Sequence, residues 1–291
     1  MPSLSFSSCF FVPFCGYFPL FMAFPSSYSS SRDRLMSQLM TVLALDFDGV
    51  ICNSAEEVLQ TALGTWSVLN PDSNLPRRFD EDPDVRRSFE RLVPLGNRAE
   101  DFGVALHILS GNLDVRTQDE YDRIRTGLGL EWLEQFHHEF YQTRSRLRTD
   151  NLNRWLAFHR EYPAFTALLE RHQNDTTLAI ATAKDGDSVR LLLRHFKIDH
   201  LFSDELILDK ETGLAKTTHL KVLADRLNCD LGLITFVDDK LNHLQATAPL
   251  GVRGVLASWG HNTPREHEDA REAEFAVATL ETVEGLLFGA G

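Results

Sequence analysis

Two aspartates that directly follow a short apolar segment constrain the fold of this chain most strongly. Residues 41–45, Thr-Val-Leu-Ala-Leu, are apolar or β-branched, as expected of a fully buried strand. Asp46, Asp48 and Gly49 follow at once, and the glycine allows the backbone to turn. Both carboxylates are therefore expected at the carboxyl end of a buried strand, the edge where open α/β sheets bind ligands. The competing interpretation is a solvated Asp-Phe-Asp-Gly turn.

The burial of these two acids has a chemical consequence. Placing carboxylates beside an apolar strand is costly unless a cation or hydrogen bonds compensate them. Asp46 and Asp48 thus indicate a hard divalent metal ion, together with an acid that can act as a nucleophile.

The chain after Pro163 alternates between strand and helix patterns. Short apolar segments predict strands at 176–182, 205–208, 233–237 and 254–257. Amphipathic segments between and beside them predict helices at 164–172, 187–196, 217–227 and 241–248. This alternation is typical of βαβ units. It predicts an α/β fold with a Rossmann-like, doubly wound parallel sheet.

The segment between the first predicted strand and this alternating region has a helical pattern. Residues 55–160 contain few β-branched residues, and their longest predicted helix, 121–147, is expected to break near Gly127 and Gly129. We therefore predict a helical domain, residues 55–160, inserted into an α/β core made of residues 39–54 and 161–291.

Residues 1–38 differ from the rest of the chain in composition. They are rich in Phe, Ser and Pro and contain no acidic residue before Asp33. No apolar run there reaches the roughly 20 residues that span a bilayer, and no basic residue precedes Phe10, as a signal peptide requires. Three interpretations stay open: a mis-assigned start with Met36 or Met40 as initiator, a cleaved targeting segment, and a disordered or membrane-associating tail.

The overall charge restricts the partners. A net charge of −13 and a pI near 5.3 argue against non-specific binding of nucleic acid and against stable association with anionic membranes. A small anionic substrate is still compatible with a locally positive pocket. The four cysteines form neither a disulfide framework nor a metal-binding spacing, which favours a reducing, cytoplasmic location. A homodimer is left open.

Polar side chains follow successive predicted strands. Because parallel strands all leave the sheet at one edge, these side chains are expected to converge. Carboxylates can hold Mg²⁺, a hydroxyl group can bind phosphate oxygens, and a lysine can neutralise transition-state charge, so the set suits phosphoryl transfer. Lys184 is either a phosphate contact or a solvated loop residue. The set comprises Asp46, Asp48, Thr182, Lys184, Asp238 and Asp239, with Lys216 at the start of the helix before the 233–237 strand.

Four short motifs resemble those of the haloacid dehalogenase superfamily of hydrolases. In this chain they are Asp46-Phe-Asp-Gly-Val50, Leu178-Ala-Ile-Ala-Thr182, Lys216 and Ile234-Thr-Phe-Val-Asp-Asp239. The resemblance covers about residues 40–260 and is strongest to phosphoglycolate-phosphatase-like members. One departure is that Gly213-Leu-Ala-Lys-Thr-Thr218 stands where relatives carry Gly-Lys-Pro.

The resemblance implies roles for the acidic residues. Asp46 would be the nucleophile that forms an aspartyl-phosphate. Asp48 would protonate the leaving alcohol and later activate water. Mg²⁺ would be held by Asp46, the backbone carbonyl of Asp48 and Asp238, with Asp239 in support.

The resemblance also implies a phosphate site and a cap. Thr182 would bind the phosphoryl group, and Lys216 would bridge the phosphate and the nucleophile. The helical insertion would be a cap that closes over the substrate.

The expected function is that of a Mg²⁺-dependent phosphatase acting on a small phosphorylated metabolite. A phosphomutase of the same family shares every one of these residues and is one alternative. A non-catalytic binding protein on an inactive hydrolase fold is the other.

Overall fold

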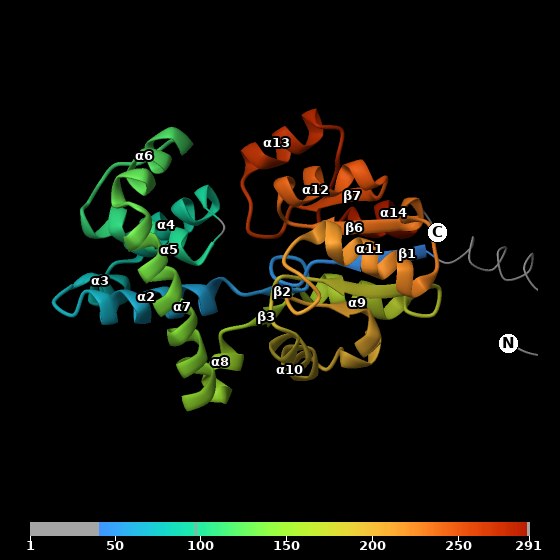
Figure 1. Cartoon of the computed structure of the whole chain (residues 1–291), viewed down its shortest axis with the longest axis horizontal. Coiled ribbons are helices and arrows are strands. Elements are labelled where there is room, and N and C mark those ends of the chain that lie inside the picture. Colours follow the sequence, from blue (N-terminus) through green and yellow to red (C-terminus); the bar gives the residue numbers. More distant parts are fainter. Residues whose placement is uncertain (1–40, 97, 290–291) are drawn as a thin grey trace, which may run out of the picture. The chain divides into compact units, whose positions relative to one another are not determined.

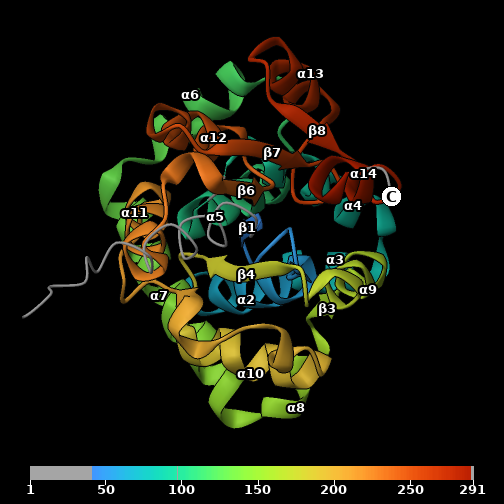
Figure 2. The same cartoon turned by 90° about the vertical axis from the view of Figure 1, so that its right-hand side faces the viewer.

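The computed structural model describes residues 41–96 and 98–289, so the predicted leader, residues 1–38, lies outside the described residues. The centre of the described part is a six-stranded sheet in the order β5-β4-β1-β6-β7-β8, and every neighbouring pair is parallel (Figures 1 and 2). The strands are β1 (Thr41–Leu45), β4 (Thr176–Ala181), β5 (Ile207–Leu208), β6 (Ile234–Asp238), β7 (Arg253–Ala257) and β8 (Ala276–Ala278). The prediction of a parallel α/β sheet is confirmed.

Two details of the sheet differ from the sequence prediction. The β5 strand is shorter than predicted because residues 204–206 form a 3₁₀ turn before it. The sheet also contains a strand that the sequence patterns do not predict, β8, which pairs with β7. The sequence of β8 is only Ala-Val-Ala, which is too short for a recognisable alternating pattern.

Helices cover both faces of the sheet because side chains alternate along each strand. On β1, Leu43 and Leu45 face a cluster that contains residues of α9, α10 and α14. Val42 and Ala44 face the opposite cluster, which contains residues of α11, α12 and α13. This is the doubly wound arrangement. These helices are α9 (Pro163–His172), α10 (Gly186–Phe196), α11 (Lys216–Leu227), α12 (Leu241–Thr247), α13 (Pro264–Glu272) and α14 (Val283–Phe288).

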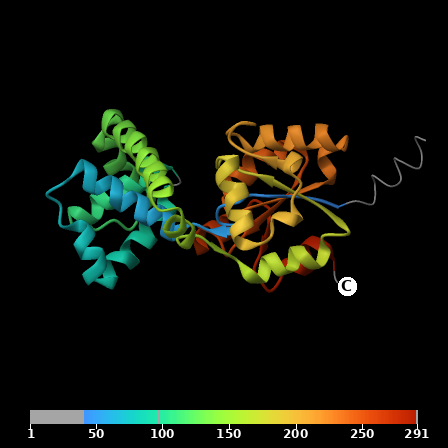
Figure 3. The ribbon, with the colours of Figure 1, turned by 90° about the horizontal axis from the view of Figure 1, so that it is seen from below.

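The segment after β1 is helical (Figure 3). It has a hydrophobic core of its own. Trp66, Phe89, Tyr121 and Phe136 are among its buried residues. The predicted break falls at Gly129, whose φ of 80° separates α6 from α7. The helices are α2 (Ala55–Leu69), α3 (Leu75–Glu81), α4 (Pro83–Leu92), α5 (Ala99–Ser110), α6 (Gln118–Leu128), α7 (Leu130–Asp150) and α8 (Leu152–Ala157).

A short antiparallel pair joins the two ends of this helical segment. Strand β2 (Cys52–Asn53) pairs with β3 (Arg160–Glu161), next to the boundaries predicted at 54/55 and 160/161. Trp155 of α8 nevertheless packs within the same cluster as Leu43 and Leu45.

Short 3₁₀ helices are η1 (Val93–Leu95), η2 (Asp199–Leu201), η3 (Asp204–Leu206), η4 (Leu231–Leu233) and η5 (Ala248–Leu250). Within residues 41–96 and 98–289, no helix has both the length and the apolar character needed to cross a membrane. Cys52 and Cys229 are free thiols.

Deleting residues 1–38 should leave the fold intact. Among the described residues, the sheet begins at Thr41, and the buried clusters on both its faces are built from residue 42 onwards. We expect urea denaturation of the full and shortened chains to give unfolding free energies within about 1 kcal/mol of each other. A loss of more than about 2 kcal/mol, a large effect for a change outside the core, would show that the deleted residues stabilise the fold.

Candidate active site

The turn after β1 fixes the first aspartate at the carboxyl edge of the sheet. The Asp46 backbone N–H donates to the carbonyl of Val237 on β6 (2.9 Å), and the Phe47 N–H donates to Asp46 Oδ1 (2.7 Å). Gly49 has a φ of 85°, and a Cβ atom there would lie 2.1 Å from Asp239 Oδ2. Only glycine therefore satisfies both the backbone conformation and the close approach of that carboxylate.

Lys216 joins the ends of three strands. Its ammonium group lies 2.6 Å from Asp46 Oδ1 after β1, 3.3 Å from Asp238 Oδ2 at the end of β6, and 2.7 Å from the carbonyl oxygen of Ala181 at the end of β4. The lysine is only 5% exposed, so these three acceptors replace water around its charge. The structure therefore brings Lys216 together with Asp46 and Asp238 at the carboxyl edge of the sheet, although the residues around it depart from the family pattern.

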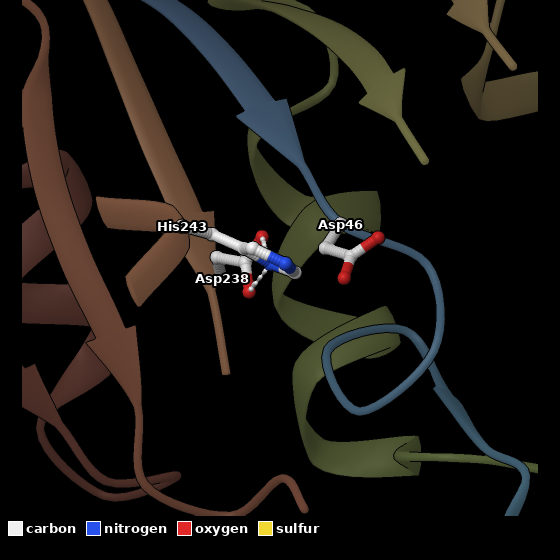
Figure 4. Close-up of side chains that lie close together, drawn as sticks. All are labelled: Asp46, Asp238 and His243. Atoms are coloured by element: carbon white, nitrogen blue, oxygen red, sulfur yellow. Dashed lines mark hydrogen bonds and ion pairs between the residues drawn. The ribbon is translucent and has the colours of Figure 1, made fainter. Parts of the chain in front are cut away.

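Asp46, Asp238 and His243 form a compact cluster (Figure 4). One ligand atom from each lies within 4.8 Å of the others. His243 Nδ1 is 3.1 Å from both carboxylate oxygens of Asp238. His243 was not among the site residues predicted from the sequence.

Burial and the neighbouring charges act in opposite directions on the pKa values of the residues in this cluster. Burial would raise the pKa of Asp238, but Lys216 and His243 outweigh it and lower that pKa. Burial raises the pKa of Asp46 even though Lys216 opposes it. Burial would lower the pKa of Lys216, but the two carboxylates raise it, so the ammonium keeps its charge. A full positive charge thus lies between two buried acids.

The residues of this cluster fit a divalent cation. The structure already holds a cation between the two carboxylates, namely the Lys216 ammonium. Carboxylate oxygens suit Mg²⁺ and Mn²⁺, and an imidazole nitrogen suits transition metals.

Asp48 lies in a separate ion pair. Its two carboxylate oxygens are 3.1 and 3.2 Å from the Lys184 ammonium, whose side chain is 7% exposed. Burial would raise the pKa of Asp48, but Lys184 lowers it to about 2. Of the two interpretations of Lys184, the solvated loop residue is wrong, because the ammonium is enclosed and paired.

Asp239 is not brought into the cluster formed by Asp46, Asp238 and His243. Its Oδ2 accepts the backbone N–H of His261 (2.6 Å). Burial raises its pKa to about 6, against the opposing effect of His261.

Thr182 directly follows β4 and is buried. Its hydroxyl oxygen accepts the backbone N–H of Lys184 (3.2 Å), and its own N–H donates to the Leu208 carbonyl (2.8 Å). It thus lies one residue beyond Ala181, whose carbonyl oxygen anchors Lys216.

Comparison with known proteins identifies the family. A sequence profile of the haloacid dehalogenase-like hydrolases matches residues 40–251. The chain belongs to the haloacid dehalogenase-like hydrolase family. No curated protein matches its sequence.

Solved structures show that the fold of this hydrolase recurs at low sequence identity. A haloacid dehalogenase-like hydrolase from Streptococcus pneumoniae is 14% identical, with a TM-score of 0.56 over 87% of this chain and 100% of that one. A predicted phosphatase from Clostridium acetobutylicum is also 14% identical, with a TM-score of 0.53 over the same shares. A predicted phosphoglycolate phosphatase from Haemophilus somnus is 20% identical, with a TM-score of 0.54 over 85% of this chain and 98% of that one. At these identities the similarity shows the fold alone.

A second buried ion pair lies near Asp48 and Lys184 in this hydrolase. Glu57 of α2 is fully buried and accepts two hydrogen bonds from Arg144 of α7, both of 2.8 Å. Burial would raise the pKa of Glu57, but Arg144 and then Lys184 lower it. The positive charge on Lys184 therefore acts on both Asp48 and Glu57.

Replacing Arg144 by methionine should destabilise the protein by about 3 kcal/mol, because it leaves the buried Glu57 charge unpaired. The double variant Glu57→Gln/Arg144→Met should lose less unfolding free energy than the two single variants lose in sum. The difference, which is the coupling energy of the double-mutant cycle, should be about 2 kcal/mol. Urea denaturation measures all four proteins. An Arg144→Met loss below about 1 kcal/mol would show that water or another cation compensates Glu57.

Proposed function

We propose that this hydrolase is a Mg²⁺-dependent phosphatase that removes the phosphoryl group of a small phosphorylated metabolite through an aspartyl-phosphate on Asp46. The observation that carries the proposal is the buried Lys216 ammonium, which joins Asp46 and Asp238 at the carboxyl edge of the sheet. An enclosed positive charge beside an aspartate is what attack on a phosphate monoester requires, since charge must be neutralised where it develops.

Asp46 is the proposed nucleophile. Its Oδ1 is held by Lys216 and by the Phe47 N–H. Among the described residues, its Oδ2 has no hydrogen-bond partner, so this oxygen is the one that attacks phosphorus. The P–O bond to the alcohol breaks as the Asp46 Oδ2–P bond forms, and the alkoxide oxygen takes a proton from Asp48.

Asp48, Thr182 and Lys216 serve the other steps of the proposal. The Thr182 hydroxyl and the Lys216 ammonium bind phosphoryl oxygens and hold the group in line with Asp46. In the second step, water attacks the phosphoryl group while Asp48 takes a proton from that water. The bond between phosphorus and Asp46 breaks, which regenerates the Asp46 carboxylate and releases phosphate.

Mg²⁺, when bound, would neutralise phosphoryl charge. The proposed ligands are Asp46, the backbone carbonyl of Asp48 and Asp238. Asp239 supports the site through its position beside Gly49.

Residues 55–160 act as a cap that excludes water from the substrate. The proposed location is the cytoplasm, because Cys52 and Cys229 are free thiols, as expected in a reducing compartment.

A panel of phosphate esters tests this function. We expect release of inorganic phosphate with Mg²⁺ and its loss in chelator, with Asp46→Asn as the inactive control. Conversion of a sugar 1-phosphate into a 6-phosphate without phosphate release would indicate a phosphomutase instead. Beryllium fluoride with Mg²⁺ should raise the melting temperature of the wild type but not of Asp46→Asn. Absence of both turnover and this shift would favour a non-catalytic binding protein.

A further inference from the structure

His243 lies at a distinctive place in the cluster. It belongs to the first turn of α12, and its ring is directed at the carboxylate of Asp238 (Figure 4). The Nδ1 atom is 3.1 Å from each of the two Asp238 oxygens, and a ring nitrogen of His243 lies within 4.8 Å of a carboxylate oxygen of Asp46. An imidazole nitrogen thus stands beside two carboxylates.

The three side chains of the cluster differ in their exposure to solvent. The Asp238 side chain is fully buried and that of Asp46 is 10% exposed, whereas that of His243 is 34% exposed. His243 therefore lies on the solvent side of the cluster, where a metal ion could reach it.

The type of ligand atom decides which metals bind well. Mg²⁺ prefers oxygen ligands, and Co²⁺ and Mn²⁺ accept imidazole nitrogen. An imidazole in the coordination sphere should add more to the affinity for Co²⁺ than to the affinity for Mg²⁺. Coordination through Nδ1 requires the neutral ring with its proton on Nε2.

We propose that His243 is a metal ligand through Nδ1, and that with Asp46 and Asp238 it makes a mixed nitrogen–oxygen site that favours first-row transition metals. This rests on the proposed function only in using a metal at Asp46 and Asp238. His261 provides a contrast: its Nδ1 is 3.9 Å from Asp239 Oδ2, and it does not belong to the cluster.

Two measurements on the full chain without substrate test the assignment. The first is the electron spin-echo modulation of bound Mn²⁺, which detects nitrogen nuclei bound to the metal. We expect a ¹⁴N coupling in the wild type, its replacement by a ¹⁵N coupling when histidine is ¹⁵N-labelled, and its loss in His243→Asn. The labelled wild type gives a result that does not depend on how any variant folds.

The second measurement is the calorimetric affinity for Co²⁺ and for Mg²⁺. His243→Asn should weaken Co²⁺ binding about tenfold or more and Mg²⁺ binding less than about threefold. His243→Asp, which supplies oxygen in place of nitrogen, should shift the preference towards Mg²⁺. His195→Asn, at an exposed histidine of α10, is the matched control and should change neither affinity.

Each outcome decides the proposal. Absence of nitrogen coupling in the wild type, or equal weakening of both metals in His243→Asn, would overturn it and leave His243 as a residue that only orients Asp238. Histidine coupling in a protein that hydrolyses no ester would support the metal ligand while the proposed phosphatase function fails. Phosphatase activity without histidine coupling would support the proposed function and overturn the assignment of His243 as a metal ligand.

Discussion

Asp46→Asn should abolish turnover while the protein still folds. The amide has nearly the shape of the carboxylate and can still accept a hydrogen bond from Lys216, which also keeps Asp238 and the Ala181 carbonyl as partners. It cannot form a stable acyl-phosphate, because its oxygen lacks the negative charge that attacks phosphorus. We expect the rate to fall by about 10³-fold or more, as when an enzyme loses its nucleophile.

The control for this experiment is Asp199→Asn, at an exposed aspartate. It should change neither the rate nor the melting temperature. Transfer of ³²P from a labelled ester to the protein, trapped by acid quenching, should be seen in the wild type and lost in Asp46→Asn. Residual activity within about tenfold of the wild type, or labelling that persists in the variant, would assign the nucleophile to another residue.

The sequence predicted the central part of this site because the geometry of a parallel sheet is general. Strand β1 occupies the predicted residues, and its buried positions follow from the apolar run. Once the sheet is parallel, the ends of β1, β4 and β6 must meet at one edge. Asp46 and Asp238 could therefore be placed together, and Lys216 beside them, without any tertiary information.

The residues that sequence analysis missed depend on details that no local pattern specifies. His243 faces Asp238 because α12 begins two residues after Asp239, so that its first turn points back at the end of β6. The short gap between the acidic pair and the helix was the available signal. The pairing of Lys184 with Asp48 depends on the path of a loop and on a rotamer, so the sequence left two interpretations open.

Asp48→Asn should separate the roles of the two aspartates. If Asp48 protonates the departing alkoxide, the fall in rate caused by Asp48→Asn should depend on the leaving group. An alkyl phosphate leaves as a strongly basic alkoxide and needs that proton, whereas an aryl phosphate with an acidic phenol needs it much less. General acid catalysis contributes about 10²–10⁴-fold. We expect a loss of this size in aspartyl-phosphate formation for alkyl esters and a much smaller one for p-nitrophenyl phosphate.

The ion pair with Lys184 makes this prediction more specific. In the free protein, burial would raise the pKa of Asp48, but Lys184 lowers it to about 2, so the carboxylate is ionised. It can act as an acid only if the arriving phosphate raises that pKa, either by its own negative charge or by drawing the Lys184 ammonium away. Lys184→Met should therefore retain the acid function better than Asp48→Asn with alkyl esters.

The first-turnover burst of released phenol or alcohol is the appropriate measurement, because Asp48 is also proposed to activate water in the second step. Asp46→Asn should lose the burst with both ester types, and Asp48→Asn should lose it chiefly with alkyl esters. An equal loss of burst rate on both types in Asp48→Asn would contradict the general-acid role. The reason is that the effect of the substitution depends on the basicity of the leaving group only if Asp48 delivers a proton to that group. With an equal loss, Asp48 would instead act on the site through its position beside Lys184.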